Sequence, residues 1–264
     1  MSLTGDVLLV GCGRLGSAIV QGWLATGALE PHRLIILTPS SKAVADQAAA
    51  LGARINPPLD ALTGVGAVVL AVKPAAWRAA ADPLIPAIPQ DAAVLSVMAG
   101  VASTALREAF GRRRLARLMP TTAVATGAGV AAFWADGEAS RIAAETVFSP
   151  IAKLIPLADE DLMHAAVGVS GSAPAFFLAL VQALGRAGAA NGLRTADAEA
   201  LARGALLSAA SVAGGDTPLD DLIGRIASPG GTTRAGLDAL AEALEQAAGL
   251  AVAAAARRSR ELGA

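Results

Sequence analysis

Three glycines near the amino terminus have the spacing of a dinucleotide-binding turn. They lie in the run Gly11-Cys12-Gly13-Arg14-Leu15-Gly16. In such a turn the first glycine permits a tight bend, the second lets backbone N–H groups approach a pyrophosphate, and the third lets a helix pack closely on a strand. The positive end of that helix would face the diphosphate. A turn without a ligand is the alternative; the strand-like run before the glycines and the helical run after them favour the dinucleotide.

Hydroxyl groups and a lysine stand where the adenosine ribose of a dinucleotide would lie. The run is Thr38-Pro39-Ser40-Ser41-Lys42. Proteins that prefer NAD usually carry an acidic residue about twenty positions past the glycines, which would repel a 2′-phosphate. Hydroxyls and an ammonium group donate to a phosphate instead. The run therefore predicts NADP(H), with NAD as the weaker alternative, and the same residues can also cap the following helix.

A lysine directly follows another strand-like run. The run extends from Ala67 to Val72, and Lys73 and Pro74 come next. Ligands of open parallel sheets bind outside the carboxyl ends of the strands. We therefore expect Lys73 and its neighbouring backbone beside the cofactor, with a solvated loop charge as the alternative.

Two segments of small residues in the second half are candidates for an anion site. They are Ser170-Gly171-Ser172-Ala173-Pro174 and Ser228-Pro229-Gly230-Gly231-Thr232-Thr233. Each is predicted to be a loop that opens a helix, where free N–H groups and hydroxyls gather. Either segment alone could be an ordinary helix cap. The presence of both favours a carboxylate-binding pocket.

The elements that must position these residues divide the chain into two domains. Short apolar runs alternate with helical segments up to about residue 158, which is typical of a doubly wound, mainly parallel sheet of the Rossmann type. Strands are predicted from Asp6 to Val10 and from Leu34 to Leu37, and a helix from Ser140 to about Ile155. From Asp159 onward the sequence predicts alanine-rich helices and no strand, and the last helix, from Thr232 to Arg260, is predicted to break near Gly249. We expect an α/β protein with a dinucleotide-binding domain at residues 1–158 and an all-α domain at residues 159–264.

Composition and charge exclude several kinds of partner. The net charge is −1, which argues against nucleic acid. Cys12 is the only cysteine, so a reducing, cytoplasmic location is expected and no disulfide can form within the chain. The uncharged span from Ala165 to Gly185 is long enough to cross a bilayer. Its glycines, serines and proline favour a buried helix instead, so no membrane partner is predicted. His32 and His164 have no metal-ligand spacing, and no metal is predicted.

The order of these motifs closely resembles the pyrroline-5-carboxylate reductase family. The resemblance rests on the glycine turn, on Ala71-Val72-Lys73-Pro74, on Gly168 to Ala175 and on the block from Ser228 to Thr233. It covers nearly the whole chain. It implies NADPH-dependent reduction of 1-pyrroline-5-carboxylate to L-proline, the last step of proline biosynthesis. It also implies a helical domain that forms a homodimer, or a dimer-based higher oligomer such as a decamer.

The resemblance assigns roles to residues by position. The implied cofactor contacts are Gly11, Cys12, Gly13, Arg14, Leu15, Gly16, Thr38, Ser40, Ala71, Val72, Lys73 and Pro74. The implied substrate residues are Glu160, Ser170, Gly231, Thr232 and Thr233. A hydroxyl such as that of Thr233 can donate to the imine nitrogen and assist hydride transfer, which makes it the candidate catalytic residue.

The sequence departs from the family pattern at several positions. Met119-Pro120-Thr121-Thr122-Ala123 replaces Met-Pro-Asn-Thr-Pro, and Asn56 is out of register with an asparagine that commonly touches the cofactor. Because these changes concern the site, reduction of another cyclic imino acid is an alternative. A non-catalytic NADP-binding sensor and a helical scaffold are two others.

Overall fold

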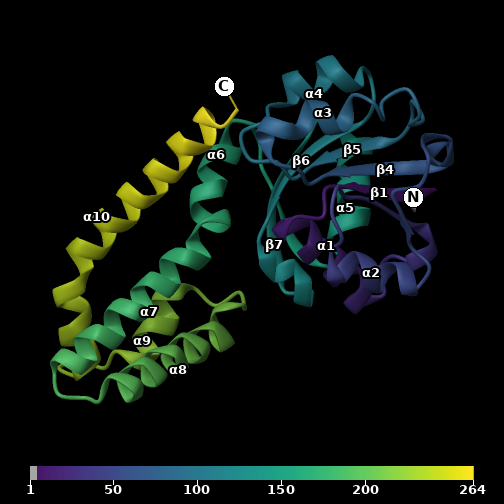
Figure 1. Cartoon of the computed structure of the whole chain (residues 1–264). Helices are drawn as coiled ribbons and strands as arrows, with labels where there is room; N and C mark the ends of the chain where they lie inside the picture. Colours follow the sequence, from purple (N-terminus) through teal and green to yellow (C-terminus); the bar gives the residue numbers. More distant parts are fainter. Residues whose placement is uncertain (1–4, 264) are drawn as a thin grey trace. The chain divides into compact units, whose positions relative to one another are not determined.

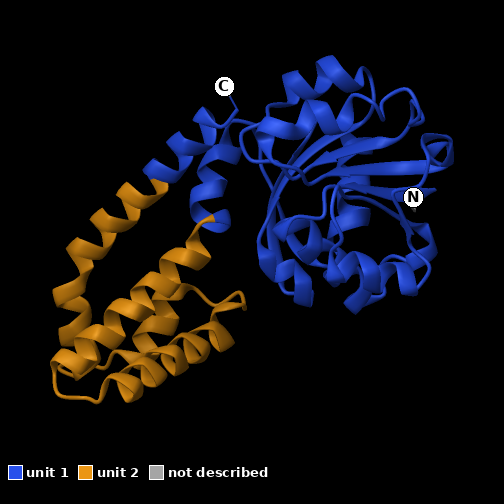
Figure 2. Ribbon diagram, viewed as in Figure 1, with its two compact units in different colours: residues 1–171, 253–264 blue, residues 172–252 orange. Residues whose placement is uncertain are grey.

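The computed structural model describes residues 5–263, which form two compact units. The first comprises residues 1–171 and 253–264, and the second comprises residues 172–252 (Figures 1 and 2). The chain therefore leaves the first unit and returns to it near its end. The predicted domain boundary at residues 158 and 159 remains a prediction, whereas the compact units divide after Gly171.

The first unit is built on one eight-stranded sheet. Its order is β3-β2-β1-β4-β5-β6-β7-β8, and all neighbouring pairs are parallel except β6 and β7. Strand β1 lies between β2 and β4, so the carboxyl ends of these three strands meet at one edge of the sheet. The strands are β1 Asp6–Val10, β2 Leu34–Leu37, β3 Arg54–Ile55, β4 Val65–Leu70, β5 Ala93–Ser96, β6 Leu115–Pro120, β7 Gly129–Ala135 and β8 Ala152–Pro156.

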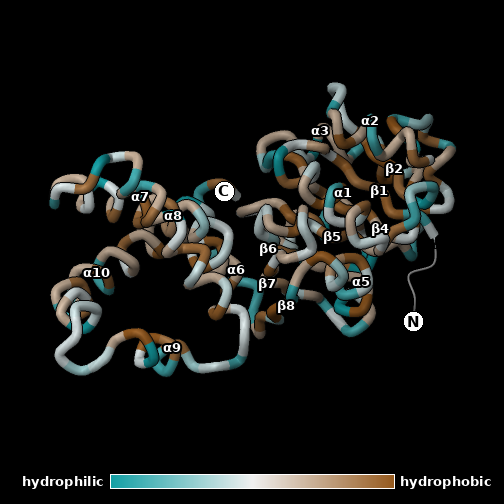
Figure 3. Tube along the Cα trace, turned by 90° about the horizontal axis from the view of Figure 1, so that it is seen from below, coloured by the Kyte–Doolittle hydropathy of each residue, from teal (hydrophilic) through white to brown (hydrophobic). Residues whose placement is uncertain are grey.

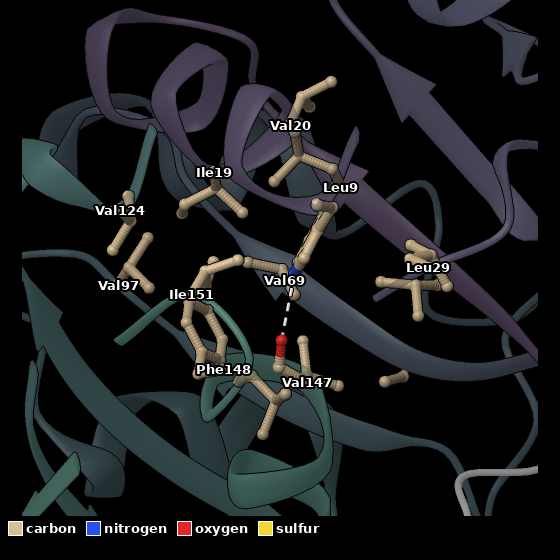
Figure 4. Close-up of a cluster of buried hydrophobic side chains, with 14 of the residues drawn as sticks. Leu9, Ile19, Val20, Leu29, Val69, Val97, Val124, Val147, Phe148 and Ile151 are labelled. Carbon is tan, nitrogen blue, oxygen red and sulfur yellow. Dashed lines mark hydrogen bonds between the residues drawn. The ribbon is translucent and has the colours of Figure 1, made fainter. Parts of the chain in front are cut away.

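Helices cover both faces of the sheet, which is why its strands read as continuous apolar runs. Alternate residues of β1 enter different cores: Leu9 packs with Ile19 and Phe148, and Leu8 packs with Leu106. Figure 4 shows the first of these cores. The helices of this unit are α1 Arg14–Thr26, α2 Ala43–Ala50, α3 Trp77–Ala81, α4 Ser103–Phe110, α5 Glu138–Phe148 and α6 Leu162–Ala166.

The second unit is helical. It contains α7 Ala173–Ala190, α8 Thr195–Ala213 and α9 Leu219–Ile226. Helix α10, Thr232–Glu261, belongs to this unit up to Val252. Figure 3 shows hydrophobic stretches along these helices as well as inside the first unit. Within the second unit itself many of the large apolar side chains are exposed, and Leu207 of α8 is 71% exposed.

The returning carboxyl-terminal segment packs closely on the loop after β5. Gly100 in this loop has a φ of 82°, and a Cβ there would lie 2.7 Å from the Ser259 carbonyl oxygen. A Cβ on Gly263 would lie only 1.8 Å from the Gly100 carbonyl oxygen. Both positions therefore require glycine, and the two backbones meet without side chains between them.

The structure confirms the predicted α/β class and the order of a sheet domain followed by helices. It corrects three local predictions. The helix predicted from Ser140 to about Ile155 ends at Phe148, and the edge strand β8 follows it. Helix α10 continues through Gly249, where a break was predicted. The segment from Val167 to Gly171 is a π-helical turn, so the predicted loop around Ser170 is wrong.

Two helical stretches of the described chain, Leu162–Ala190 and Thr232–Glu261, are long and apolar enough to cross a membrane by length and composition alone. That is weak support for a membrane span, since the core helix of a soluble protein passes the same test.

Candidate functional site

The glycine turn joins β1 to α1 and has no room for larger residues. Gly11 has a φ of 97°, and a Cβ there would lie 2.8 Å from the Ala71 carbonyl oxygen. A Cβ on Gly16 would lie 2.1 Å from the Gly11 carbonyl oxygen, so the first turn of α1 packs directly on the bend. These two glycines have the roles that their spacing predicts.

The middle glycine faces open space. A Cβ on Gly13 would meet no atom within 4 Å, and no side chain caps the amino terminus of α1 there. The first N–H groups of the thirteen-residue helix therefore have no capping side chain. Free N–H donors at the positive end of a helix bind anions. The cradle fits the pyrophosphate of a dinucleotide.

The other members of the turn have different environments. The Cys12 side chain is buried, and its Sγ lies 3.5 Å from the Ser17 hydroxyl, which also donates to the Cys12 carbonyl oxygen at 3.1 Å. Arg14 is exposed and Leu15 is partly buried. Only backbone atoms of Cys12 can therefore face a ligand, whereas the guanidinium of Arg14 can reach one.

Strand order brings the other predicted cofactor residues to the same edge of the sheet. Thr38 directly follows β2 and Ala71 directly follows β4, on opposite sides of β1. The N–H of Ala71 donates to the Val10 carbonyl oxygen at 2.8 Å. Val72 and Pro74 are partly buried, whereas Lys73 is exposed. The glycine turn, Thr38 and the segment from Ala71 to Pro74 thus form one continuous rim.

A cavity of about 280 Å³ lies at the end of β2. The Thr38 hydroxyl donates to the Ser40 carbonyl oxygen at 2.9 Å, which folds the chain back at Pro39. Ser41 donates to the Asp46 carboxylate at 2.9 Å, so the hydroxyl of Ser40 and the ammonium of Lys42 are the groups left for a phosphate. The lining residues are Thr38, Pro39, Ser40, Ser41, Lys42, Ala45, Asp46, Ile55 and Asn56.

Asn56 is a member of this site that the motif analysis did not assign. It has a φ of 46° and is the only non-glycine residue between positions 5 and 263 with a positive φ. Its amide accepts a hydrogen bond from the Thr38 N–H and donates one to the Thr38 carbonyl oxygen, each at 2.9 Å. The sequence signal was an asparagine, a residue tolerant of this conformation, between a short strand and two prolines.

Glu160 lies in a buried polar cluster of the first unit. Its carboxylate accepts hydrogen bonds from the backbone N–H and hydroxyl of Ser103 and from Arg117 Nη1, the last at 2.6 Å. Arg117 is 3% exposed, and its Nε and Nη2 have no partner among the described residues. Burial alone would raise the pKa of Glu160, but the hydrogen bonds from Ser103 and Arg117 outweigh it and lower that pKa. Glu160 therefore holds the start of α4 as an anion.

His164 connects α6 to the returning segment. Its Nδ1 lies 3.0 Å from the Ser259 hydroxyl. Burial, followed by the positive charges of Arg117 and Arg260, lowers the pKa of His164. A neutral histidine that hydrogen-bonds α6 to α10 agrees with a structural role for His164.

The remaining predicted substrate residues lie in different units. The Ser170 hydroxyl, in the first unit, donates to the Ala166 carbonyl oxygen at 2.9 Å within the helical run. Gly231, Thr232 and Thr233 lie in the second unit, where α10 begins at Thr232. The Gly231 N–H donates to the Ser228 carbonyl oxygen at 3.0 Å. Both small-residue segments therefore open a helix as predicted, α7 at Ala173 and α10 at Thr232, but a π-helical turn and not a loop precedes the first helix.

The fold and the rim of its sheet define a dinucleotide-dependent protein of the Rossmann class. Residues 6–100 match the family model described as NADP oxidoreductase coenzyme F420-dependent, and residues 160–262 match the one described as pyrroline-5-carboxylate reductase dimerisation. The pyrroline-5-carboxylate reductase of Arabidopsis thaliana is 32% identical over 96% of this chain and 94% of its own length. That of Thermus thermophilus is 34% identical over 96% and 97%.

A solved structure agrees with these relatives. The pyrroline-5-carboxylate reductase of Coxiella burnetii is 27% identical, covers 99% of both chains and superposes with a TM-score of 0.87. The chain belongs to the pyrroline-5-carboxylate reductase family. The predicted oxidoreductase class and the predicted NADP(H) cofactor are confirmed, since both halves of the chain match models or relatives of that kind.

Proposed function

We propose that the protein reduces the C=N bond of 1-pyrroline-5-carboxylate to L-proline with NADPH, as the last step of proline biosynthesis in the cytoplasm. The observation that supports this most strongly is the similarity to reductases with that name over 96% of the chain, and the matched dimerisation model spans the block from Ser228 to Thr233. The cavity at Thr38 to Lys42 supports NADPH, with NADH as the weaker donor.

The bound cofactor would supply a hydride to the imine carbon. The backbone N–H groups from Gly13 to Gly16 would hold its pyrophosphate, and Ser40 and Lys42 would hold the adenosine 2′-phosphate. The segment from Ala71 to Pro74 would line the rim on the other side of β1. These residues bind and orient the reactants, which is how most of the rate would arise.

For the substrate we assign the beginning of α10. The N–H groups of Thr232 and Thr233 would hold the carboxylate, since that of Gly231 donates to the Ser228 carbonyl oxygen. The Thr233 hydroxyl would donate a hydrogen bond to the imine nitrogen, which takes up one proton from solvent as the hydride adds to the imine carbon. Glu160 is assigned to the substrate by the resemblance alone, because within the first unit its carboxylate is engaged by Ser103 and Arg117. Ser170 would have to release the Ala166 carbonyl oxygen before its hydroxyl could donate to the substrate.

A second candidate substrate, another cyclic imino acid, is favoured by one observation. The departing segment from Met119 to Ala123 begins at the end of β6, and Met119 lies 3.6 Å from the position of a Cβ on Gly171. The segment therefore begins against the π-helical turn that carries Ser170, and the altered residues Thr121 and Ala123 follow directly in the sequence. Different residues at this point of the substrate site would change the size of the imine ring that the site accepts.

We also propose a homodimer formed through the helical unit, with dimer-based assemblies such as a decamer as the next level. Helices α7 and α8 line a cavity of about 730 Å³ with Leu178, Val181 and Gln182 among its walls. The exposed apolar side chains of this unit support burial against a second copy rather than against lipid, because Arg186, Glu199 and Arg203 line the same cavity.

The test is NADPH oxidation by the purified protein with 1-pyrroline-5-carboxylate, run beside NADH and beside 1-piperideine-2-carboxylate. Rapid turnover of the five-membered imine, faster with NADPH, is the expected result. Turnover of the six-membered imine alone would support the second substrate. NADP binding without turnover of either imine would leave only the sensor.

The proposed role of Thr233 predicts that its substitution lowers the rate of imine reduction without weakening cofactor binding. Thr233→Ala should lower kcat/KM by roughly ten- to a thousandfold, because a hydrogen bond made in the transition state disappears. Thr233→Ser keeps the hydroxyl and should recover most of the rate. Unchanged kinetics in the alanine variant would remove Thr233 from the mechanism.

A further inference from the structure

The side-chain amide of Asn56 makes two hydrogen bonds to the backbone of one residue, Thr38. It bridges the N–H and the carbonyl oxygen of Thr38, each at 2.9 Å, and its own N–H donates to the Ile36 carbonyl oxygen at 2.9 Å. Both strands end at this point, since β3 stops at Ile55 and β2 at Leu37. The side chain therefore continues the pairing of β2 and β3 by one residue after the strands themselves have ended.

The residue that Asn56 holds begins the turn that carries the groups for a 2′-phosphate. The Thr38 hydroxyl donates to the Ser40 carbonyl oxygen, so the orientation of the Thr38 peptide sets where Ser40 and Lys42 start. Asn56 and these residues line the same cavity. Loss of the Asn56 hydrogen bonds would free the Thr38 carbonyl group and the turn that carries Ser40 and Lys42, whereas the glycine turn keeps its own hydrogen bond, from the Gly11 N–H to the Leu37 carbonyl oxygen at 2.8 Å.

The backbone conformation at position 56 is part of the arrangement. A φ of 46° costs most L residues free energy, and asparagine is among the few that adopt it readily. In this conformation the short amide side chain reaches both backbone groups of Thr38. Sequence register alone did not identify this contact, because it is made to the protein backbone.

We propose that Asn56 is a positioning residue that sets the preference for NADPH over NADH. Its amide clamps the Thr38 peptide so that Ser40 and Lys42 are presented to a 2′-phosphate. The clamp acts through the turn from Thr38 to Lys42, so its loss weakens the binding of NADPH and largely spares the binding of NADH. This inference rests on the proposed use of NADPH.

Asn56→Gly is the variant that isolates the clamp. Glycine adopts the positive φ freely, so the backbone is not strained while both hydrogen bonds to Thr38 are removed. Calorimetric titration of the full-length protein with NADP⁺ and with NAD⁺ should show the Kd for NADP⁺ rising about tenfold and that for NAD⁺ rising less than about threefold. The preference for NADP⁺ falls accordingly.

A second measurement reports the clamp without any nucleotide. The Thr38 N–H donates to Asn56 Oδ1, so its hydrogen exchange should be slow in the wild-type protein and at least about tenfold faster in Asn56→Gly. Exchange at Leu9 of the central strand should not change, which shows that the variant is folded.

Asn191→Gly is the matched control. Asn191 also donates its amide to a backbone carbonyl, that of Ala187 at 2.9 Å, but lies at the end of α7 in the other unit. The preference of the Asn191→Gly variant for NADP⁺ over NAD⁺ should equal that of the wild-type protein. The same substitution thus removes an asparagine–backbone bond at two sites, only one of which lines the cavity.

The outcomes separate this inference from the proposed function. Equal losses of NADP⁺ and NAD⁺ affinity in Asn56→Gly would mean a direct contact to a part that both cofactors share, and would overturn the clamp. Unchanged affinities, or unchanged exchange at Thr38, would overturn it as well. Failure of the wild-type protein to bind NADP⁺ would instead overturn the proposed use of NADPH.

Discussion

The two compact units bury their apolar side chains in different ways. In the first, Leu8 and Leu9 of the central strand are fully buried beneath helices of the same chain. In the second, Leu178 and Leu207 are exposed by more than half of their surface. The nucleotide rim is therefore fixed by one chain's own core. Gly231, Thr232 and Thr233, which are assigned to the substrate, lie at the start of a helix in the unit whose large apolar side chains are exposed within one chain.

The largest expected effect is at the packed turn of the first unit. Gly16→Ala places a Cβ 2.1 Å from a backbone oxygen that cannot move aside. The free energy of unfolding should fall by about 4 kcal/mol, and NADPH binding should be lost. Denaturant unfolding and calorimetric titration measure the two effects. A stable variant with normal affinity would mean that the turn is not rigid.

A somewhat smaller effect is expected in the polar cluster of the first unit. Glu160→Gln leaves the buried guanidinium of Arg117 without its counter-charge, which should cost about 3 kcal/mol of unfolding free energy at pH 7. Urea unfolding measures the loss. Glu145→Gln, on an exposed ion pair with Arg141, is the control and should cost less than about 1 kcal/mol.

The same cluster predicts a dependence on pH. The folded-state pKa of Glu160 is lowered, so its contribution is complete above its unfolded pKa of about 4.3 and is lost as pH falls through the folded value. Between about pH 5 and pH 3 the wild-type protein should lose stability more steeply than Glu160→Gln. Parallel curves for the two proteins would show that this carboxyl does not titrate as described.

A substitution on the exposed surface of the second unit tests whether a second copy of the chain covers that surface. Leu207→Ser removes an apolar side chain that is 71% exposed within one chain. If a second copy covers it, the dimer dissociation constant should rise by roughly tenfold or more, while NADP⁺ affinity stays the same. Sedimentation at several concentrations measures the shift. An unchanged oligomer would place the interface elsewhere.

The smallest effect on stability is expected at Gly236, a glycine of the second unit with open space around it. A Cβ on Gly236, inside α10, would meet no atom within 4 Å. Gly236→Ala should therefore leave the protein unchanged or more stable by up to about 1 kcal/mol, since alanine is the better helix former. A marked loss instead would show that this face packs against another copy of the chain.

The difference between the units also explains what the sequence predicted well. Strands β1 and β2 were predicted at their observed bounds, because chains buried on both faces carry unbroken apolar runs. Strand β8 was missed because it lies at the edge of the sheet, is largely exposed and ends in Pro156, so its sequence has no strand pattern. The π-helical turn at Ser170 was missed because glycine and serine usually indicate loops.

The site was predictable to the extent that it depends on backbone shape. The glycines were identified because a tight turn and a close helix require their residue type, and Thr38 was expected at the same edge because it follows the second strand. The ion pair of Arg117 with Glu160 and the amide of Asn56 were not identified, since each joins residues far apart in the sequence. The carboxylate of Glu160 was assigned to the substrate by position, and its hydrogen bonds within the first unit appear only in three dimensions.

The meeting of Gly100 and Gly263 has a consequence for biosynthesis. A ribosome must make residues 172–252 before it makes the segment that packs on the loop after β5. At ordinary elongation rates this interval lasts roughly 4 to 16 seconds. During it the nascent sheet domain carries an uncovered backbone at Gly100, and an exposed helical unit has already emerged. The first unit is therefore completed only after the second has been made, when the last turn of α10 reaches the loop after β5.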